Sequence, residues 1–468
     1  MPNSSNGSFN RRTMIAGTAA GSIAASVASA AAPAPEKEGK LSIGLFRFDV
    51  TPPTGHPLCG GWIKPVEAVD DPLEAIGYVL QGCGKPIVVC VVDWTGLLNS
   101  AHIKWRQALA DGAGTTIDRV TVHCVHQHNA PFACLDANEI LTAQGDLPLT
   151  VEPAFFDNCL KSAKSAAQQA LESTVPVTHV ATGQAEVEKV AGNRRLIGLD
   201  GKVRSQRGSS SKSPAHQIYP EGLIDPMLKQ VAFYNGDKKV AACYYYACHP
   251  MSYYGDGRVS SDFCGLARKQ MQIAEPDCTH MYFNGCGGNI GAGKYNDGSK
   301  EMRPILMNRI LTGMQKSSEA LEPKEITSVS WVTKDILPPV NPSVDEDKLM
   351  QQISDHGERV VNRNRPSYAV AWSRRIKKKI PVTLSGLHLN NVSLIHLPSE
   401  SFIEYQLRAQ AEAPDRFVAC AAYGDGGPWY IPTADAFPQG GYAASVAWCA
   451  PAIDPILSTG IKDLLTKV

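Results

Sequence analysis

The chain contains several stretches in which apolar residues follow one another or alternate with polar ones, as they do in β-strands. The continuous apolar run 86–92 predicts a buried strand, and the run 120–125 predicts another. Residues 41–50 alternate, whereas 231–234 and 240–248 flank an Asn-Gly-Asp turn and predict a hairpin. Shorter stretches of the same kind predict strands at 178–190, 280–283, 329–332, 387–390 and 392–396.

Other segments place apolar residues three or four positions apart among good helix formers, which is the period of an amphipathic helix. Helices are predicted at 102–110, 154–171, 262–274, 304–321 and 402–412. The serine-rich segment 201–220 is predicted to be a loop. Because strands and helices interleave, the predicted fold class is α/β, with mixed β-sheets flanked by helices. We find no internal repeat and no long linker, so residues 41–468 are expected to form one large domain.

The first 30 residues have the pattern of a twin-arginine export signal. Arg11 and Arg12 precede a weakly apolar run, and Ala28-Ser29-Ala30 offers a cleavage site of small residues. Residues 31–40 are then a linker. The apolar run is too short and too rich in Gly, Ala and Ser to span a bilayer, and no later run is long enough. We therefore expect a periplasmic or secreted protein without a transmembrane segment.

The charge balance excludes some classes of partner. Lys plus Arg and Asp plus Glu each number 45, so the formal net charge is zero and nothing favours nucleic acid or an anionic membrane. One basic stretch, 359–379, stands out. A solvated helix face is the favoured explanation for it, and a patch for an anionic substrate is the alternative. A small-molecule or lipid-like substrate is expected, and the sequence does not indicate an oligomeric state.

Cysteine spacing argues against some kinds of site. The chain has 13 cysteines and no Cys-x-x-Cys, which disfavours a structural zinc knuckle or a thioredoxin-like centre. Several of them stand within apolar runs and are predicted to be small buried hydrophobic residues, while one or two disulfides stay open.

Histidines end two of the apolar runs. His126 and His128 follow the run 120–125, and His249 follows the second strand of the predicted hairpin. Alternate residues of an extended chain point to the same side, so His126 and His128 could line one cavity. A hydrolytic zinc requires three or four nitrogen and oxygen ligands and one position for water. Glu400, at a predicted strand-to-helix junction, is the candidate carboxylate.

Each of these residues also has an ordinary structural explanation. A lone histidine at a strand end is more often a hydrogen-bonded polar group than a ligand. A glutamate at a helix start often complements the helix dipole. The combination of imidazoles and a carboxylate is what favours a metal-dependent hydrolase.

Eight blocks of the sequence, in order, resemble the catalytic domain of the neutral/alkaline, non-lysosomal ceramidase family. The blocks are 48–53, 71–73 with 87–93, 125–131, 192–194, 248–250 with 260–263, 284–289, 398–402, and 429–433 with 440–442. The resemblance implies a single large ceramidase-like domain with one bound Zn²⁺. The implied zinc ligands are His126, His249, Glu400 and Tyr430.

The resemblance also implies roles for residues beside the metal. His128 would be free for proton transfer to a departing amine. Arg194 and Tyr442 would stabilise the developing oxyanion. Asp262 could orient a ligand imidazole, and an acid at a helix N-terminus is the alternative for it.

Two departures from the family pattern bear on the substrate. Gly285 stands where the family carries a serine, and the long ceramidases continue into an immunoglobulin-like domain that we do not find here. Segment 288–294 has the spacing of a phosphate-binding loop, but Tyr295 replaces the required Ser or Thr. We therefore expect a glycine loop beneath the active site and no nucleotide.

The function that the sequence favours is hydrolysis of an amide, with an N-acyl compound as the first expectation. The alternatives are a zinc-dependent esterase, carbohydrate hydrolase or lyase on the same scaffold, or a non-catalytic binding protein. A long apolar trough beside Tyr430 and Tyr442 would favour acyl chains. A short pocket lined by Arg, Lys and Trp, with Arg194 and Trp429 as candidates, would favour sugar acids.

Overall fold

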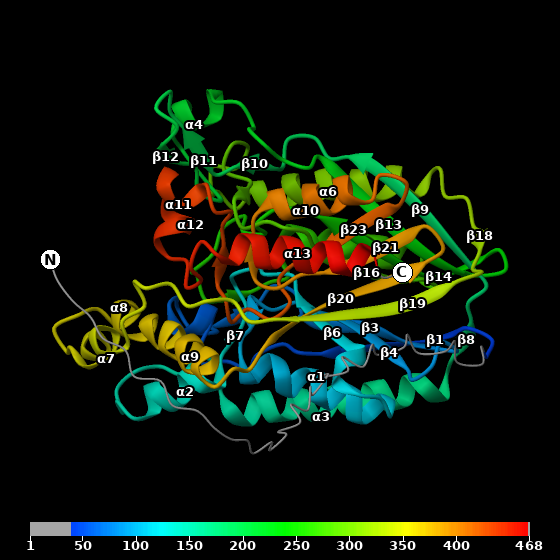
Figure 1. The fold of residues 1–468 in the computed structure, drawn as a ribbon, viewed down its shortest axis with the longest axis horizontal. Coiled ribbons are helices and arrows are strands. Elements are labelled where there is room, and N and C mark those ends of the chain that lie inside the picture. The colour runs from blue at the N-terminus through cyan, green and yellow to red at the C-terminus, as the bar shows by residue number, and fades with distance from the viewer. Residues whose placement is uncertain (1–38, 467–468) are drawn as a thin grey trace, which may run out of the picture. The chain divides into compact units, whose positions relative to one another are not determined.

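The structure is a computed structural model that describes residues 39–466. The predicted export signal, and all but the last residues of the predicted linker, lie outside the described residues. Within the described range, the longest apolar helices fall short of what a membrane crossing needs. The described residues form the predicted α/β fold, with helices packed on mixed sheets (Figure 1).

The first sheet has the strand order β6-β4-β3-β1-β8. Its strands are β1 (Ser42–Asp49), β3 (Glu74–Gln81), β4 (Ile87–Val92), β6 (Val120–Cys124) and β8 (Val175–Pro176). Strand β3 is antiparallel to both β1 and β4, and β6 is parallel to β4. Helix α1 (Ser100–Ala113) connects β4 to β6, and α3 (Pro153–Glu172) packs beside it.

The second and third sheets have the orders β16-β14-β13-β9-β18 and β19-β20-β21-β23. The second contains β9 (His179–Glu186), β13 (Met227–Asn235), β14 (Lys238–Tyr246), β16 (Thr279–Asn284) and β18 (Lys324–Glu325). The third contains β19 (Val329–Ile336), β20 (Val382–Leu389), β21 (Val392–His396) and β23 (Phe417–Ala421). Their helices are α5 (Asp262–Ala274), α6 (Met302–Ser318), α10 (Ile403–Glu412) and α13 (Ile453–Thr466).

The three sheets repeat one arrangement. Each has three successive antiparallel strands, a helix, a fourth strand parallel to the third, and a second helix. The expectation of no repeat therefore holds for the amino-acid sequence and is wrong for the structure, in which one arrangement occurs three times. The repeat is preserved only as a pattern of buried and exposed positions, which many unrelated residues satisfy.

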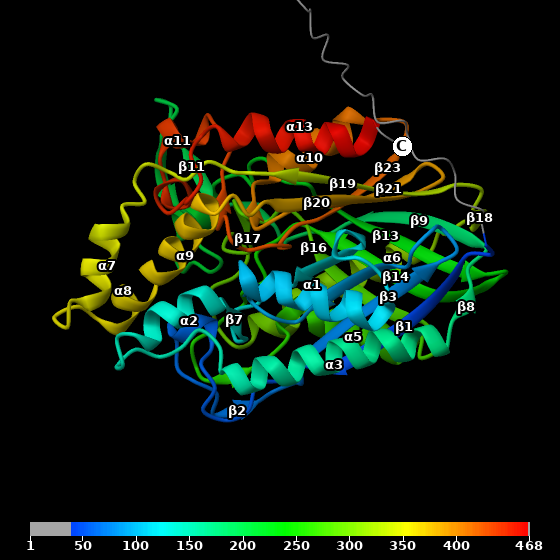
Figure 2. The same ribbon diagram turned by 60° about the horizontal axis from the view of Figure 1, so that its bottom comes forward.

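The inner faces of the three sheets share one hydrophobic core, and their outer faces pack on helices (Figure 2). In β4 the alternation is complete, because successive side chains of a strand point to opposite faces. Ile87, Val89 and Val91 enter the shared core. Val88, Cys90 and Val92 pack in the cluster that contains α1 and α3.

Two local predictions need correction. The segment 201–220 contains a strand, β12 (Val203–Gln206), and a short helix, α4 (Pro214–Ile218). The basic stretch is helical, with α8 (Val360–Asn364) and α9 (Pro366–Lys377), but α9 is largely buried. Its apolar centre, 368–372, packs in the core while most of the charges stand at its two ends.

The cysteines agree with their predicted packing role. All but Cys83 are buried, and these buried thiols form no disulfide within residues 39–466. Burial raises the pKa of the Cys59 thiol to about 12, which keeps it protonated and unreactive.

Candidate active site

The candidate residues gather where the third and fourth strands of the three sheets end. His126 follows β6, His249 follows β14 and Glu400 follows β21, while Tyr423 and Tyr430 follow β23. Each third strand is parallel to its fourth, so their carboxyl ends meet at one edge of each sheet. That edge is where open α/β sheets bind ligands.

His126 is held in a defined orientation. Its backbone adopts φ 77°, a conformation that costs free energy for a residue with a side chain. Its Nδ1 lies 2.6 Å from the carbonyl oxygen of Thr95 and donates a hydrogen bond to it. The proton is thereby fixed on Nδ1, and Nε2 keeps its lone pair. Nε2 lies 3.5 Å from Oε2 of Glu400.

His249 approaches the same carboxylate from the second sheet. Its Nδ1 lies 3.8 Å from Oε2 of Glu400. Tetrahedral zinc ligands with bonds of about 2.0–2.1 Å lie about 3.4 Å apart, close to both distances to Glu400. His126 Nε2, His249 Nδ1 and Glu400 Oε2 are buried and have no hydrogen-bond partner. A shared cation or proton between these three atoms would satisfy them.

His128 lies beside this group. Its ring centroid is 5.0 Å from those of both His126 and His249, and candidate ligand atoms of the three imidazoles all lie within 4.8 Å of one another. Its Nδ1 is also buried without a partner. Burial lowers the pKa of His128, and His126 and Arg194 lower it further. The geometry therefore brings His128 to the centre as either a proton carrier or a further ligand.

Tyr430 is tied to Glu400 through the backbone. The two residues are register partners in a short parallel pair formed by β22 (Glu400–Ser401) and β24 (Tyr430–Ile431). Burial raises the pKa of Tyr430, and the charge of Glu400 raises it further. Arg194 donates a hydrogen bond of 3.1 Å from Nη1 to the Tyr430 hydroxyl, and the Tyr442 ring centroid lies 5.8 Å from that of Tyr430. All seven predicted site residues thus lie in one connected region.

Sequence reasoning missed two residues here. Tyr423 stacks on His126 with ring centroids 4.3 Å apart, and its buried hydroxyl has no hydrogen-bond partner. It adopts φ 58° two residues after β23, as His126 adopts φ 77° two residues after β6. Thr95 acts through its backbone carbonyl. The sequence feature that could have indicated Tyr423 is a tyrosine, with its polar hydroxyl group, just after an apolar strand.

Comparisons with described protein families and with curated protein sequences find no match. Among solved structures, neutral ceramidase from Pseudomonas aeruginosa is similar, with a TM-score of 0.65 over 92% of this chain and 75% of that chain, at 14% identity. A ceramidase complexed with C2 has the same TM-score over 92% and 76% of the two chains, at 12% identity.

This chain has a neutral ceramidase-like fold. The predicted resemblance is confirmed at that level, and at such low identity the likeness leaves the chemistry to be argued from the residues of the site.

In this ceramidase-like fold the glycine-rich segment lies directly against Glu400. A Cβ at Gly288 would stand 2.2 Å from the Glu400 carbonyl oxygen, and one at Gly287 would stand 2.7 Å from the Tyr423 hydroxyl. Lys294 donates its ammonium hydrogens to the carbonyls of Gln217 and Tyr219. The segment therefore packs against the candidate site, as expected for a glycine loop beneath it.

Two further predictions concern residues near the loop. Asp262 accepts hydrogen bonds from the backbone of Ser252 and Phe263, with Arg303 at 3.6 Å. These partners fit the alternative of an acid at the start of α5, and no imidazole is among them in the described chain. At Gly285 a Cβ would stand 2.5 Å from Oε1 of Gln406. A serine there would require Gln406 to move.

A second group of possible ligands lies elsewhere in the ceramidase-like fold. Glu275, Cys278 and His280 bring candidate atoms within 4.8 Å of one another at the start of β16. Lys239 lies 2.6 Å from the Glu275 carboxylate and already neutralises it. The Cys278 thiol is kept protonated because burial raises its pKa to about 12. This group is therefore the poorer metal site.

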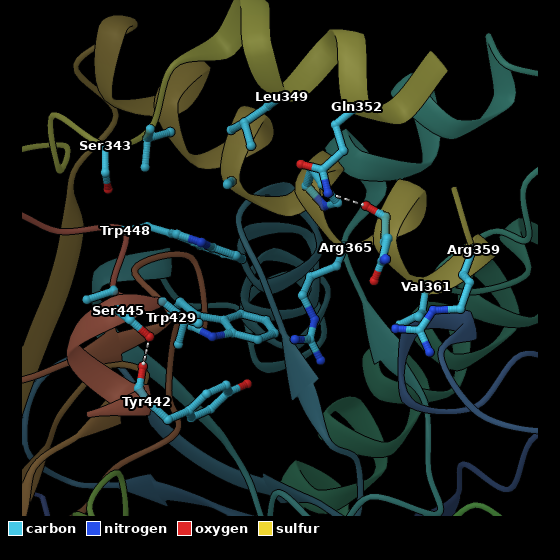
Figure 3. A pocket seen from close by; sticks show the side chains of 16 residues that line it. Ser343, Leu349, Gln352, Arg359, Val361, Arg365, Trp429, Tyr442, Ser445 and Trp448 are labelled. Atoms are coloured by element: carbon cyan, nitrogen blue, oxygen red, sulfur yellow. Dashed lines mark hydrogen bonds between the residues drawn. The ribbon is translucent and has the colours of Figure 1, made fainter. Parts of the chain in front are cut away.

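An open pocket of about 580 Å³ adjoins the candidate site (Figure 3). Tyr442 and Trp429 stand on its wall, and Trp429 also lines a small cavity together with His126 and Glu400. Trp429 packs on Trp448 with ring centroids 4.4 Å apart. The pocket is thus an aromatic-walled space next to the candidate site, and it is large enough for part of a small molecule.

Proposed function

We propose that this protein is an exported zinc-dependent hydrolase that cleaves an amide bond. The observation that carries the proposal is the convergence of His126 Nε2, His249 Nδ1 and Glu400 Oε2, all buried and all without partners. Export rests on the amino-terminal sequence alone. Hydrolysis rests on the arrangement of side chains around this convergence, and it is supported by the likeness to ceramidase structures.

The residues present fit a zinc ion. Two imidazoles and one carboxylate are the ligand types of catalytic zinc sites, and the His126–Thr95 hydrogen bond is the support that such ligands commonly have. Tyr430, paired with Glu400, is the proposed fourth ligand. When bound, zinc would lower the pKa of a water molecule toward about 7 and polarise the scissile carbonyl.

The remaining side chains supply the other parts of an amide hydrolysis. His128 has an unpartnered ring nitrogen and is proposed to accept a proton from the attacking water and then hand it to the amine as it departs. The buried guanidinium of Arg194 donates a hydrogen bond from Nη1 to the Tyr430 hydroxyl, and its Nε has no partner in the described chain. Arg194 and Tyr442 are proposed to donate hydrogen bonds to the oxygen that becomes negative, at about 3 kcal/mol for each donor.

The pocket beside the site favours a second candidate, a hydrolase or lyase acting on an acidic carbohydrate. Trp429, Trp448 and two arginines line the pocket, and these are residue types that stack on sugar rings and bind carboxylates. The first candidate keeps precedence because the three-ligand convergence and the ceramidase-like fold do not depend on the pocket.

The experiment that tests the proposed function compares the wild type with His128→Ala. Wild-type protein should contain one zinc per chain and release octanoic acid from N-octanoylglycine or N-octanoylglycinamide. His128→Ala should keep its zinc while turnover falls by about 10²- to 10⁴-fold, because only proton transfer is lost. Metal analysis and product detection measure the two quantities. Loss of zinc from this variant would make His128 a ligand, and wild-type protein inactive on both amides would contradict amide hydrolysis.

A further inference from the structure

The basic stretch 359–379 divides into two groups of side chains. One group forms ion pairs: Arg363 with Asp146 at 2.6 Å, and Arg375 with Asp425 at 2.7 Å. Arg374 and Lys377 both approach Glu346 and belong to the same group. Arg359 and Arg365 form no ion pair with a carboxylate of the described chain, and both line the pocket of Figure 3. The alternative that the sequence left open therefore applies to these two residues.

Arg365 is placed to bind an anion rather than to support the fold. Its guanidinium lies 4.6 Å from the Trp62 ring, a cation–π contact that orients it without neutralising its charge. Its Nε is buried and has no hydrogen-bond partner. Figure 3 shows the guanidinium turned toward Trp429 and Tyr442. A half-buried guanidinium with unused donors calls for an acceptor from outside the chain.

The rest of the pocket carries no opposing charge. None of its lining residues is Asp or Glu, whereas the two arginines make it positive. A wall of low polarity weakens screening and strengthens attraction of an anion. Trp429 and Trp448 form a flat face beside the guanidinium that suits a ring or an acyl chain. An uncharged sphingolipid-like amide would leave the two guanidinium groups unpaired.

The pocket adjoins the candidate site. Tyr442 belongs to its wall and packs edge-on against Tyr430, which Arg194 contacts. A molecule held in the pocket would therefore lie beside the tyrosine that packs on Tyr430.

We propose that this pocket recognises a carboxylate on the substrate, with Arg365 as the principal contact, Arg359 in support and Trp429–Trp448 as the packing face. The substrate class is an acidic compound, either an N-acyl amino acid or a sugar acid, whose scissile bond lies at the histidines. The inference rests on the proposed hydrolase function for the position of that bond. The binding of the carboxylate itself needs only the pocket.

Isothermal titration calorimetry with two pairs of probes tests this proposal. N-octanoylglycine is compared with N-octanoylglycinamide, and 4-nitrophenyl glucuronide with 4-nitrophenyl glucoside, so that each pair differs by one carboxylate. The acid should bind about tenfold to 100-fold more tightly than its neutral partner in at least one pair. A preference in the first pair identifies the acyl source, and a preference in the second identifies the sugar acid.

Variants assign the preference to the residue. Arg365→Met should reduce it to less than about twofold, and Arg365→Lys should keep a part of it because the charge remains. Arg359→Met changes an exposed position and should cause a smaller loss of the preference. It replaces Arg365→Met as the test if that variant does not fold. Arg374→Met, which removes an arginine outside the pocket, should leave the preference unchanged.

Two results overturn the proposal: no acid preference in either pair, or a preference that survives Arg365→Met at full size. These results are separable from failure of the proposed function. Hydrolysis of both octanoyl amides at equal rates would keep the hydrolase and remove the carboxylate pocket. Acid-selective binding without hydrolysis or zinc would keep the pocket and remove the hydrolase.

Discussion

Replacing His249 with alanine should strip the protein of its metal and nearly all of its activity. The imidazole enters the cluster from the end of β14 in the second sheet, with Nδ1 3.8 Å from Oε2 of Glu400. Loss of an indirect supporting contact already costs 10- to 100-fold in metal affinity, so loss of a ligand should cost at least about 100-fold. The rate constant kcat/KM for amide hydrolysis should fall by about 10³-fold or more, equivalent to about 4 kcal/mol.

His388→Ala is the matched control for this variant. His388 is also a buried histidine, and its Nδ1 bonds Ser393 at 3.0 Å, within the third sheet and away from the cluster. Its removal should cost stability while zinc content and turnover per folded molecule stay at the wild-type level. Metal analysis of protein purified without added zinc measures the contrast. Equal zinc in His249→Ala and the wild type would remove His249 from the ligand set.

Glu400→Gln should separate metal binding from stability. The substitution keeps the shape of the side chain and removes a charge that is buried next to two unpartnered imidazole nitrogens. Without metal, the variant should melt at the same temperature as the wild type or higher, because Oε2 of this buried carboxylate has no hydrogen-bond partner. With zinc at about 100 times its dissociation constant, the wild type should gain about 2.7 kcal/mol and the variant little.

Thermal unfolding with and without zinc measures this difference. Glu404→Gln is the control, because Glu404 lies in the first turn of α10 and its carboxylate accepts a 2.9 Å hydrogen bond from Asn289. That variant should keep the full gain from zinc. Amide hydrolysis should fall about 10³-fold in Glu400→Gln only. A zinc-dependent gain of wild-type size in Glu400→Gln would show that the carboxylate is not a ligand.

The sequence predicted best those elements that have a strong hydrophobic periodicity and clear residues marking where they begin and end. The strand at 392–396 and the helix at 262–274 have the predicted bounds. Helix α9 was misjudged because its arginines and lysines suggest a wet surface, whereas ion pairs such as Arg375–Asp425 allow it to be buried. Strand β3 and helix α13 were not predicted. The packing that distinguishes such apolar segments comes from distant parts of the chain.

The residues of the candidate site likewise divide into those that the sequence predicted and those that it missed. His126, His249 and Glu400 could be predicted because a polar residue that ends an apolar run stands at a sheet edge. Tyr423 was missed because its ring counts as an apolar residue in a pattern. Thr95 was missed because its carbonyl, which any residue could provide, is what orients His126. The ligand roles remain predictions that the variants above address.

The most direct test of the account is anomalous X-ray diffraction at the zinc edge from crystals of the wild-type protein. We expect one strong peak within about 2.3 Å of His126 Nε2, His249 Nδ1 and a Glu400 oxygen. A cluster that gives no peak, or a peak only at Glu275, Cys278 and His280, would contradict the assignment of the zinc site and the function built on it.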